Sequence, residues 1–187
     1  MASMTPHDYF EAGQALLAGG GIQAVTIANV CARLGTTKGS FYHHFRNVED
    51  FHDRLLDDWY VEHVARRKAV VDAEPDPLGR LEALRRFGLD RRHDTEAAIR
   101  SWARTSPRAA EVQRRIDNNR RTYFADTCQA LGIDRARCDA FAELALLITA
   151  GSQNLCGPVD RELVERAGGF LCASVLATAE VEGTSSS

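Results

Sequence analysis

The sequence has little of what disordered, membrane-spanning or secreted proteins need. Its 187 residues include only 5 prolines, and no apolar run approaches the ~20 residues that span a bilayer. The N-terminus has no basic segment followed by an apolar one, so we expect no secretory leader. Because 44% of the residues are hydrophobic, a chain of this length can bury a sizeable core. We therefore expect a soluble globular protein.

The cysteines give no sign of a disulfide framework. There are five of them, an odd number, and no two form a C-x-x-C pair. This pattern argues against both disulfides and a zinc knuckle, and favours reduced thiols buried as small apolar groups in a cytoplasmic protein. The five are Cys31, Cys128, Cys138, Cys156 and Cys172.

Motifs of the common enzyme classes are also missing. The sequence contains no Gly-rich phosphate loop, no G-x-S-x-G and no H-E-x-x-H. The adjacent His43 and His44 would diverge by ~100° on a helix, and neither has a His or carboxylate partner four residues away. We expect no catalytic residues, no cofactor and no metal site. A helical enzyme acting on an acidic metabolite remains the alternative from a different functional class.

The formal net charge of −3 excludes a uniformly basic nucleic-acid binder, so the distribution of charge must decide. Residues 22–47 contain Arg33, Lys38 and Arg46 but no Asp or Glu. This short basic segment lies in an otherwise acidic N-terminal region. We expect it to bind an anionic partner.

Apolar residues recur with the 3.6-residue period of helices throughout, which predicts an all-α fold. A first helix should begin at Pro6, with Thr5 as its N-cap, and stop at residues 19–21, which are three consecutive glycines. Thr26 is the expected cap of a second helix that ends at Gly35, and Thr37 the cap of a third, in which Phe41 and Phe45 point inward.

A long helix is expected from Val48 to the Pro-containing break at residues 74–77. Beyond the break, the pattern predicts helices at about 77–92, 94–104, 107–131, 134–156 and 160–182. Residues 183–187 are expected to be a disordered tail.

Two short helices joined by a Gly-containing turn are typical of a helix-turn-helix, whose second helix enters the major groove. The second helix and its flanks carry hydroxyl, cationic and imidazole side chains, which suit phosphate oxygens and base edges. Gly39 would let the backbone approach a groove wall closely. These polar residues are Thr36, Thr37, Lys38, Ser40, Tyr42, His43, His44 and Arg46.

The sequence from Thr26 to Phe45, followed by Arg46 to Asp50, resembles the DNA-binding domain of the TetR family of transcriptional regulators. The similarity covers roughly residues 8–55, and its most specific part is Leu-Gly-x-x-x-Gly-x-Phe-Tyr-x-His-Phe, which begins at Leu34. The resemblance implies a homodimer that binds a palindromic operator in double-stranded DNA. It also implies a helix-turn-helix domain at 1–47 and an effector-binding and dimerisation domain at 48–182, with 48–74 as the connecting helix.

The resemblance assigns roles to individual residues. The chain departs from the family at Val48, where a phosphate-binding lysine is common, so Arg46 or Asn47 is expected to take that role. The implied roles are phosphate contact for Thr26, base-edge and phosphate contact for Thr37, Lys38, Gly39 and Ser40, and contacts beside the groove for Tyr42 and His43, while His44 matches the family's usual histidine.

An effector pocket would need apolar walls with a few polar groups that orient the ligand. Seven residues have suitable side chains, although core packing is an alternative for each aromatic one: Trp59, His63, Phe87, Trp102, Asn119, Tyr123 and Phe141. The arginines between residues 100 and 121 could form a solvated basic face or bind an acidic effector, and the sequence does not decide between them. They include Arg104, Arg108, Arg114, Arg115 and Arg120.

Residues 138–156 and 160–182 are rich in small and aliphatic side chains, which favours a four-helix dimer interface over a core within one chain. Taken together, the sequence predicts a regulator, most simply a repressor that a small organic ligand releases from its operator. Alternatives with the same DNA-binding head are an effector-independent DNA-binding protein and an activator.

Overall fold

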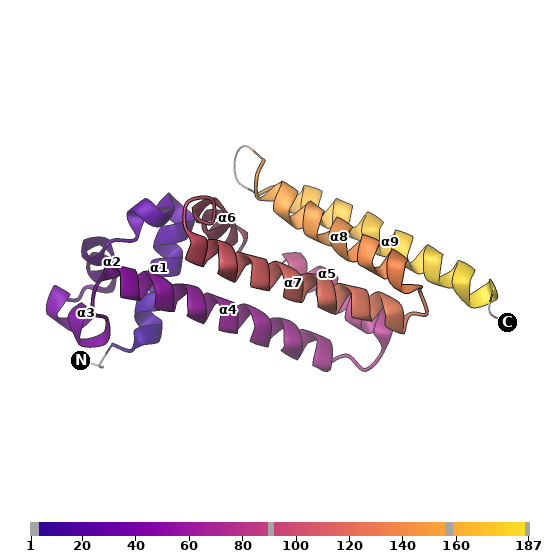
Figure 1. Ribbon diagram of the computed structural model, residues 1–187, viewed down its shortest axis with the longest axis horizontal. Coiled ribbons are helices and arrows are strands. Elements are labelled where there is room, and N and C mark those ends of the chain that lie inside the picture. The colour runs from indigo at the N-terminus through magenta and orange to yellow at the C-terminus, as the bar shows by residue number, and fades with distance from the viewer. Residues whose placement is uncertain (1–3, 90–91, 156–158, 186–187) are drawn as a thin grey trace. The chain divides into compact units, whose positions relative to one another are not determined.

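A computed structural model describes residues 4–89, 92–155 and 159–185, and every regular element in these ranges is helical (Figure 1). This confirms the all-α prediction. None of the described helices is long and apolar enough to cross a membrane. The elements are α1 (Pro6–Gly20), the 3₁₀ helix η1 (Ile22–Ala24), α2 (Ile27–Leu34), α3 (Lys38–His44), α4 (Val48–Asp72), α5 (Pro77–Leu89), α6 (His93–Trp102), α7 (Pro107–Ala130), α8 (Arg135–Ser152) and α9 (Arg161–Ser185).

The helix starts expected near the N-terminus are confirmed by their capping bonds. The Thr5 side chain accepts the N–H of Asp8, and the Asp8 carboxylate accepts the N–H of Thr5 at 2.6 Å, which completes a capping box. Thr26 and Thr37 cap α2 and α3 by accepting an N–H three residues ahead, each at 3.2 Å. These bonds involve only neighbours in the chain, which is why the sequence reveals them.

The described chain forms two compact units. The first comprises residues 4–62 and 92–114, and in it α1 packs against both α2 and α6. Its core is aromatic: Phe41, Phe45 and Phe51 are at most 1% exposed, and the Phe45 and Phe51 ring centroids lie 4.9 Å apart. The first part of α4 also belongs to this unit, so the core of the unit includes residues beyond position 47. The division into a DNA-binding domain at 1–47 and an effector domain from 48 concerns function, and it stays a prediction.

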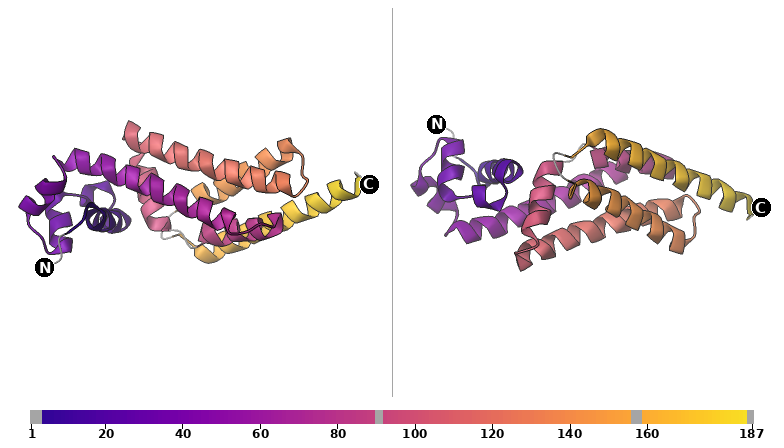
Figure 2. Two further views of the ribbon diagram at one scale, coloured as in Figure 1. Left: turned by 90° about the horizontal axis from the view of Figure 1, so that it is seen from below. Right: turned by 90° about the horizontal axis from the view of Figure 1, so that it is seen from above.

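The second unit comprises residues 63–89, 115–155 and 159–185. Within it α9 packs against both α8 and α5 (Figures 1 and 2). Its core is a cluster of buried residues: Leu81, Phe124, Ala125, Cys128, Ile133, Cys138, Ala142, Leu171 and Val175. Ala142, Leu171 and Val175 were expected at a dimer interface, but they pack within their own chain.

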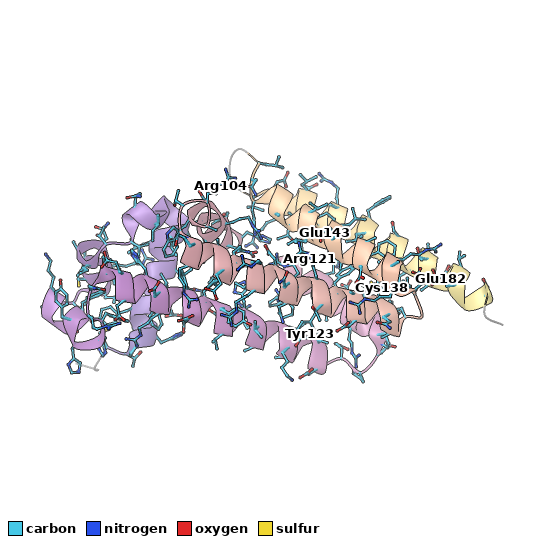
Figure 3. All side chains as sticks on the ribbon, in the orientation of Figure 1. Arg104, Arg121, Tyr123, Cys138, Glu143 and Glu182 are labelled. Atoms are coloured by element: carbon cyan, nitrogen blue, oxygen red, sulfur yellow. The ribbon has the colours of Figure 1, made fainter. Side chains whose placement is uncertain are left out.

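Ion pairs join the outer surfaces of these helices. Figure 3 shows Arg121 of α7 beside Glu143 of α8, and the Arg121 Nε to Glu143 Oε2 distance is 2.6 Å. This hydrogen bond lowers the pKa of Glu143 below its usual value. Arg137 of α8 pairs with Glu182 of α9 at 2.8 Å. Exposed pairs of this kind add little stability, so the buried cluster holds the unit together.

The last two helices end at other residues than the sequence predicts. α8 ends at Ser152 rather than near 156, and α9 continues to Ser185, through residues assigned to a disordered tail. In α9 the Thr184 hydroxyl donates to the Val181 carbonyl at 2.8 Å, so Gly183 does not end the helix. The expected break at Gly157 and Pro158, like Cys156, lies outside the described residues.

Four cysteines lie in the described part of the chain, and none of these four is in a disulfide. Cys31, Cys128 and Cys138 are buried, whereas Cys172 is half-buried. Burial raises the pKa of Cys128 to about 12, so this thiol is protonated at neutral pH and packs as an apolar group.

Candidate nucleic-acid interface and ligand cavity

The turn between α2 and α3 depends on Gly35, which has φ 62° and ψ 33°. This left-handed conformation is costly for residues that carry a Cβ, and it lets the chain reverse immediately after α2. The Thr36 N–H then bonds to the Cys31 carbonyl at 3.0 Å, and Thr37 caps the next helix. The two short helices and their turn form the helix-turn-helix that the sequence predicts.

The third helix has a buried side and an exposed side. Phe41 is fully buried and Phe45, directly after the helix, is 1% exposed, which confirms that both point inward. Tyr42 is 54% exposed, and Lys38 and His43 are exposed with it. The exposed side therefore presents an ammonium, a phenol and an imidazole, all of which can bind nucleic-acid groups.

Three of the residues expected to contact DNA are half-buried rather than exposed: Thr36, Ser40 and His44. The hydroxyls of Ser40 and Tyr9 share a hydrogen bond of 2.7 Å, and the His44 ring lies 5.4 Å from the Tyr9 ring, centroid to centroid. Ser40 and His44 thus hold α3 against α1. The remaining members of the predicted set, Thr26, Thr37, Gly39, Arg46 and Asn47, are exposed.

Arg46 and Asn47, the expected replacements for the missing lysine, both bind Asp50. The Arg46 backbone N–H and guanidinium donate to the Asp50 carboxylate, each at 3.0 Å, and Asn47 Oδ1 accepts the Asp50 N–H at 2.7 Å. The two Arg46 bonds hold the pKa of Asp50 below its usual value. Arg46 and Asn47 therefore bind the first turn of α4 through Asp50, and both remain exposed at the surface.

Arg54 is a residue of this region that the sequence analysis missed. Its Nη1 donates to the His44 carbonyl at 2.7 Å, at the C-terminal end of α3, and its guanidinium lies 4.8 Å from the Phe45 ring centroid. A cation at this end of a helix is favourable for the helix dipole. No local pattern links Arg54 to α3, because the contact needs the tertiary packing of α4.

The second unit contains a cavity of about 90 Å³. Four polar side chains stand in its largely apolar wall: Arg67 of α4, Arg85 of α5, Arg120 of α7 and Thr149 of α8. Among the described residues, no Asp or Glu lines the cavity. Its apolar wall includes Leu84, Phe87, Phe124, Ile148, Val164 and Leu171.

The seven predicted pocket residues do not gather in one place. Phe87 lines the cavity, and Asn119 accepts a hydrogen bond from the cavity residue Arg67. His63 is buried and Tyr123 half-buried in the second unit, both outside the cavity lining, and Phe141 packs against the core cluster. Trp59 and Trp102 belong to the first unit; Trp59 is in its core, and Trp102 lies 5.5 Å from the His52 ring.

The arginines between residues 100 and 121 have different positions. Arg104, Arg114 and Arg115 are exposed, and Arg108 is paired with Asp57 and Glu111. Arg120, by contrast, is 8% exposed and lines the cavity. Charge and spacing in the sequence do not distinguish Arg120 from its neighbours. Within residues 4–89, 92–155 and 159–185, no group of three His, Cys, Asp or Glu residues could hold a metal ion.

Comparisons with known proteins agree with this geometry. Residues 10–55 match the sequence model of the family described as bacterial regulatory proteins, tetR family. The HTH-type transcriptional repressor KstR2 of Mycobacterium tuberculosis is 34% identical over 77 residues, which are 41% of this chain and 38% of the repressor. The sequence match therefore covers well under half of that relative.

Solved structures share the fold over nearly the whole chain. A Rhodococcus transcriptional regulator matches 93% of this chain and 97% of its own, with a TM-score of 0.73 and 23% identity. The structure of KstR2 itself matches 95% of each chain, with a TM-score of 0.59 and 20% identity. A Saccharomonospora viridis transcriptional regulator in complex with choline matches 89% and 94%, with a TM-score of 0.74 and 15% identity. The similarity to the tetR family of bacterial regulatory proteins therefore lies in residues 10–55, the part of the chain that contains the helix-turn-helix.

Proposed function

We propose that the protein is a DNA-binding transcriptional repressor that a small organic ligand releases from a palindromic operator. The observation that carries this proposal is the exposed side of α3, where Lys38, Tyr42 and His43 stand together on a helix that follows a tight turn. Residues 22–47 contain no carboxylate that would repel phosphate. The family match over residues 10–55 and the name of the repressor KstR2 support the same function.

In the proposed complex, Lys38 and Thr37 contact phosphates or base edges at the N-terminal end of α3. Tyr42 and His43 contact the backbone beside the groove. Gly39 has open space around it, with only the Thr37 hydroxyl within 4 Å of where a Cβ would lie, so α3 can approach a groove wall closely. The half-buried Ser40 and His44 hold the helix in position.

A homodimer would place two such helix-turn-helix motifs on one operator. Its half-sites would lie ~34–36 Å apart, which is one turn of the DNA helix. Exposed large apolar side chains on the last two helices suit the dimer contact, because such residues can mark the surface where another chain binds. Leu144 and Leu147 of α8 are 47% and 57% exposed, and Phe170 of α9 is 78% exposed. We therefore assign the interface to these exposed residues. Ala142, Leu171 and Val175, which the sequence suggested for it, lie in the core of the second unit.

Control by a ligand requires a physical connection between the cavity and the helix-turn-helix. α4 supplies Phe51 to the core of the first unit and Arg67 to the wall of the cavity in the second. A ligand that prefers one position of α4 would therefore change operator affinity, and a coupling of ~1–3 kcal/mol corresponds to roughly 5- to 150-fold. The structural relative that holds choline supports small-molecule binding by this fold.

The test is selection of bound DNA from a random pool, followed by salt titration with the selected site. The proposal predicts a two-fold symmetric site and an affinity that falls steeply as salt rises, because phosphate contacts release counterions. Binding that is indifferent to DNA sequence would overturn it.

A further inference from the structure

Two arginines in the wall of the second unit's cavity are paired with carboxylates of the protein. Arg85 donates to the two carboxylate oxygens of Glu82, at 2.8 Å each, and its guanidinium also lies 3.8 Å from the carboxylate of Glu165. Arg120 donates to Asp117 at 3.2 Å. A ligand anion in the cavity would have to compete with these carboxylates, and a ligand cation would meet like charge.

The other contacts of the arginines also lie within the protein. Arg67 donates to the Asn119 amide oxygen, and its Cζ lies 5.6 Å from the centroid of the Phe87 ring. Arg85 has its methylene stem beside Gly168, since a Cβ at Gly168 would lie 3.9 Å from Arg85 Cγ, and both residues line the cavity. An arginine can in this way cover an apolar surface with its stem while its guanidinium binds elsewhere. The arginines therefore do not require a charged ligand.

The rest of the described cavity wall is apolar or has its polar group in use. The Thr149 hydroxyl donates to the Ala145 carbonyl at 3.1 Å, within α8. Burial raises the pKa of the Cys172 thiol, so this side chain is uncharged at neutral pH. Such a wall favours a hydrocarbon ligand, because a polar or charged group would lose its water without an equal replacement. The apolar lining includes Leu84, Phe87, Phe124, Ala145, Ile148, Val164 and Leu171.

The volume of the cavity limits the size of the ligand. An apolar cavity of ~150 Å³ in a model protein accepts benzene, so roughly 25 Å³ is available for each carbon atom of that ligand. The cavity of the second unit measures about 90 Å³. By the same ratio, it has space for about three or four non-hydrogen atoms.

Resting on the proposed function, we propose that the effector binds in this cavity as a neutral apolar group of about three or four non-hydrogen atoms. Phe124, Ile148 and Leu171 enclose this group. Phe87 forms another part of the wall, and Arg67 of α4 lies over its ring. The ligand therefore acts on α4 through packing against Phe87 rather than through an ion pair.

Four probes of equal size and different polarity test the ligand class: 2-methylpropane, propan-2-ol, isopropylammonium and acetate. Each is titrated into the full chain at the same pH and ionic strength, and the methyl NMR signals of Ile148, Val164 and Leu171 are followed. 2-Methylpropane is expected to shift these signals but not those of Leu144 and Leu147, which are 47% and 57% exposed.

The other three probes are expected to bind at least about tenfold more weakly, because each would bury a polar or charged group in an apolar cavity. Equal affinity for any of these three would overturn the inference. The same conclusion follows if 2-methylpropane leaves the cavity methyl signals unchanged.

Variants locate the binding site. Ala145→Leu places a larger side chain in the cavity that Ala145 lines, so the affinity for 2-methylpropane should fall by at least about tenfold. Ala140→Leu is the matched control, because Ala140 lies in the same helix and is exposed, and its affinity should equal that of the wild type. Ala145→Val replaces Ala145→Leu if the latter does not fold. Wild-type affinity in the folded Ala145 variant would contradict the proposed site.

Measuring operator binding with the same four probes separates this inference from the proposed function. If 2-methylpropane binds in the cavity but leaves operator binding unchanged, the ligand class holds and ligand release fails. If acetate or isopropylammonium releases the DNA and 2-methylpropane does not, ligand release holds and the inference of a neutral apolar ligand fails. If no probe binds and the operator still does, the inference fails while DNA recognition remains.

Discussion

Replacement of Phe45 by alanine separates the structural side of α3 from the side proposed to bind DNA. The Phe45 ring is 1% exposed, and its centroid lies 5.0 Å from that of Phe41, 4.9 Å from that of Phe51 and 5.5 Å from that of Tyr9. The Arg54 guanidinium covers it at 4.8 Å. Truncation would leave a cavity among aromatic rings that are already packed against one another.

The expected cost of Phe45→Ala is ~3–5 kcal/mol of unfolding free energy, which is typical of a buried Phe-to-Ala change. For a chain of this length that loss corresponds to a Tm decrease of roughly 6–20 °C. Urea unfolding followed by tryptophan fluorescence is a suitable assay, because both tryptophans, Trp59 and Trp102, belong to the same unit as Phe45.

Tyr42→Ala is the matched control, because Tyr42 lies in α3, three residues before Phe45, and is 54% exposed. Its stability loss should stay within about 0.5–1 kcal/mol, whereas its affinity for the selected operator should fall. Similar losses of stability in the two variants would refute the assignment of the two sides of α3. A Phe45→Ala variant as stable as the wild type would refute it as well.

Four further predictions follow from individual residues. Lys38→Ala should weaken operator binding and reduce the salt dependence by about one counterion, with little change in Tm, as measured by fluorescence anisotropy at several salt concentrations. Gly35→Ala should cost ~1–2 kcal/mol in urea unfolding, because φ at Gly35 is +62° and alanine is strained there. Hydrogen bonds from Arg46 lower the pKa of Asp50 in the folded state. The ionised carboxylate therefore stabilises the fold at pH values above its unfolded pKa, and this contribution disappears as pH falls through the lower folded pKa. Asp50→Asn should therefore make the free energy of unfolding less sensitive to pH below about 5. Phe170→Glu should shift the sedimentation equilibrium from dimer towards monomer without unfolding the chain, and an unchanged dimer would exclude this face from the interface.

The local features of the fold were predictable because their causes are close together in the chain. Thr5, Thr26 and Thr37 cap the helices they were expected to cap, since each bond reaches only three residues ahead. η1 was missed, because its short turn of Ile22–Ala24 has no distinctive apolar pattern. The end of α9 was placed too early, because a glycine near a helix end is usually a stop signal.

The cavity was not predictable, because it depends on which of several similar side chains tertiary packing buries. Arg67 is 2% exposed, yet its neighbours Arg66 and Lys68 are exposed. The same contrast separates Arg120, in the cavity wall, from Arg121, which pairs with Glu143. Charge and spacing in the sequence do not distinguish these neighbours. Only Phe87 of the seven predicted pocket residues lines the cavity, because burial of an aromatic side chain does not reveal what it packs against.

Photo-crosslinking can show whether the exposed side of α3 contacts DNA. A photo-reactive phenylalanine analogue is placed at Tyr42 or, as a control, at Val61 of α4, whose side chains are 54% and 63% exposed, and each protein is irradiated with the selected operator. The proposed contact predicts cross-linked DNA from position 42 and little from position 61. Cross-linking that is absent at position 42, or equal at the two positions, would contradict it.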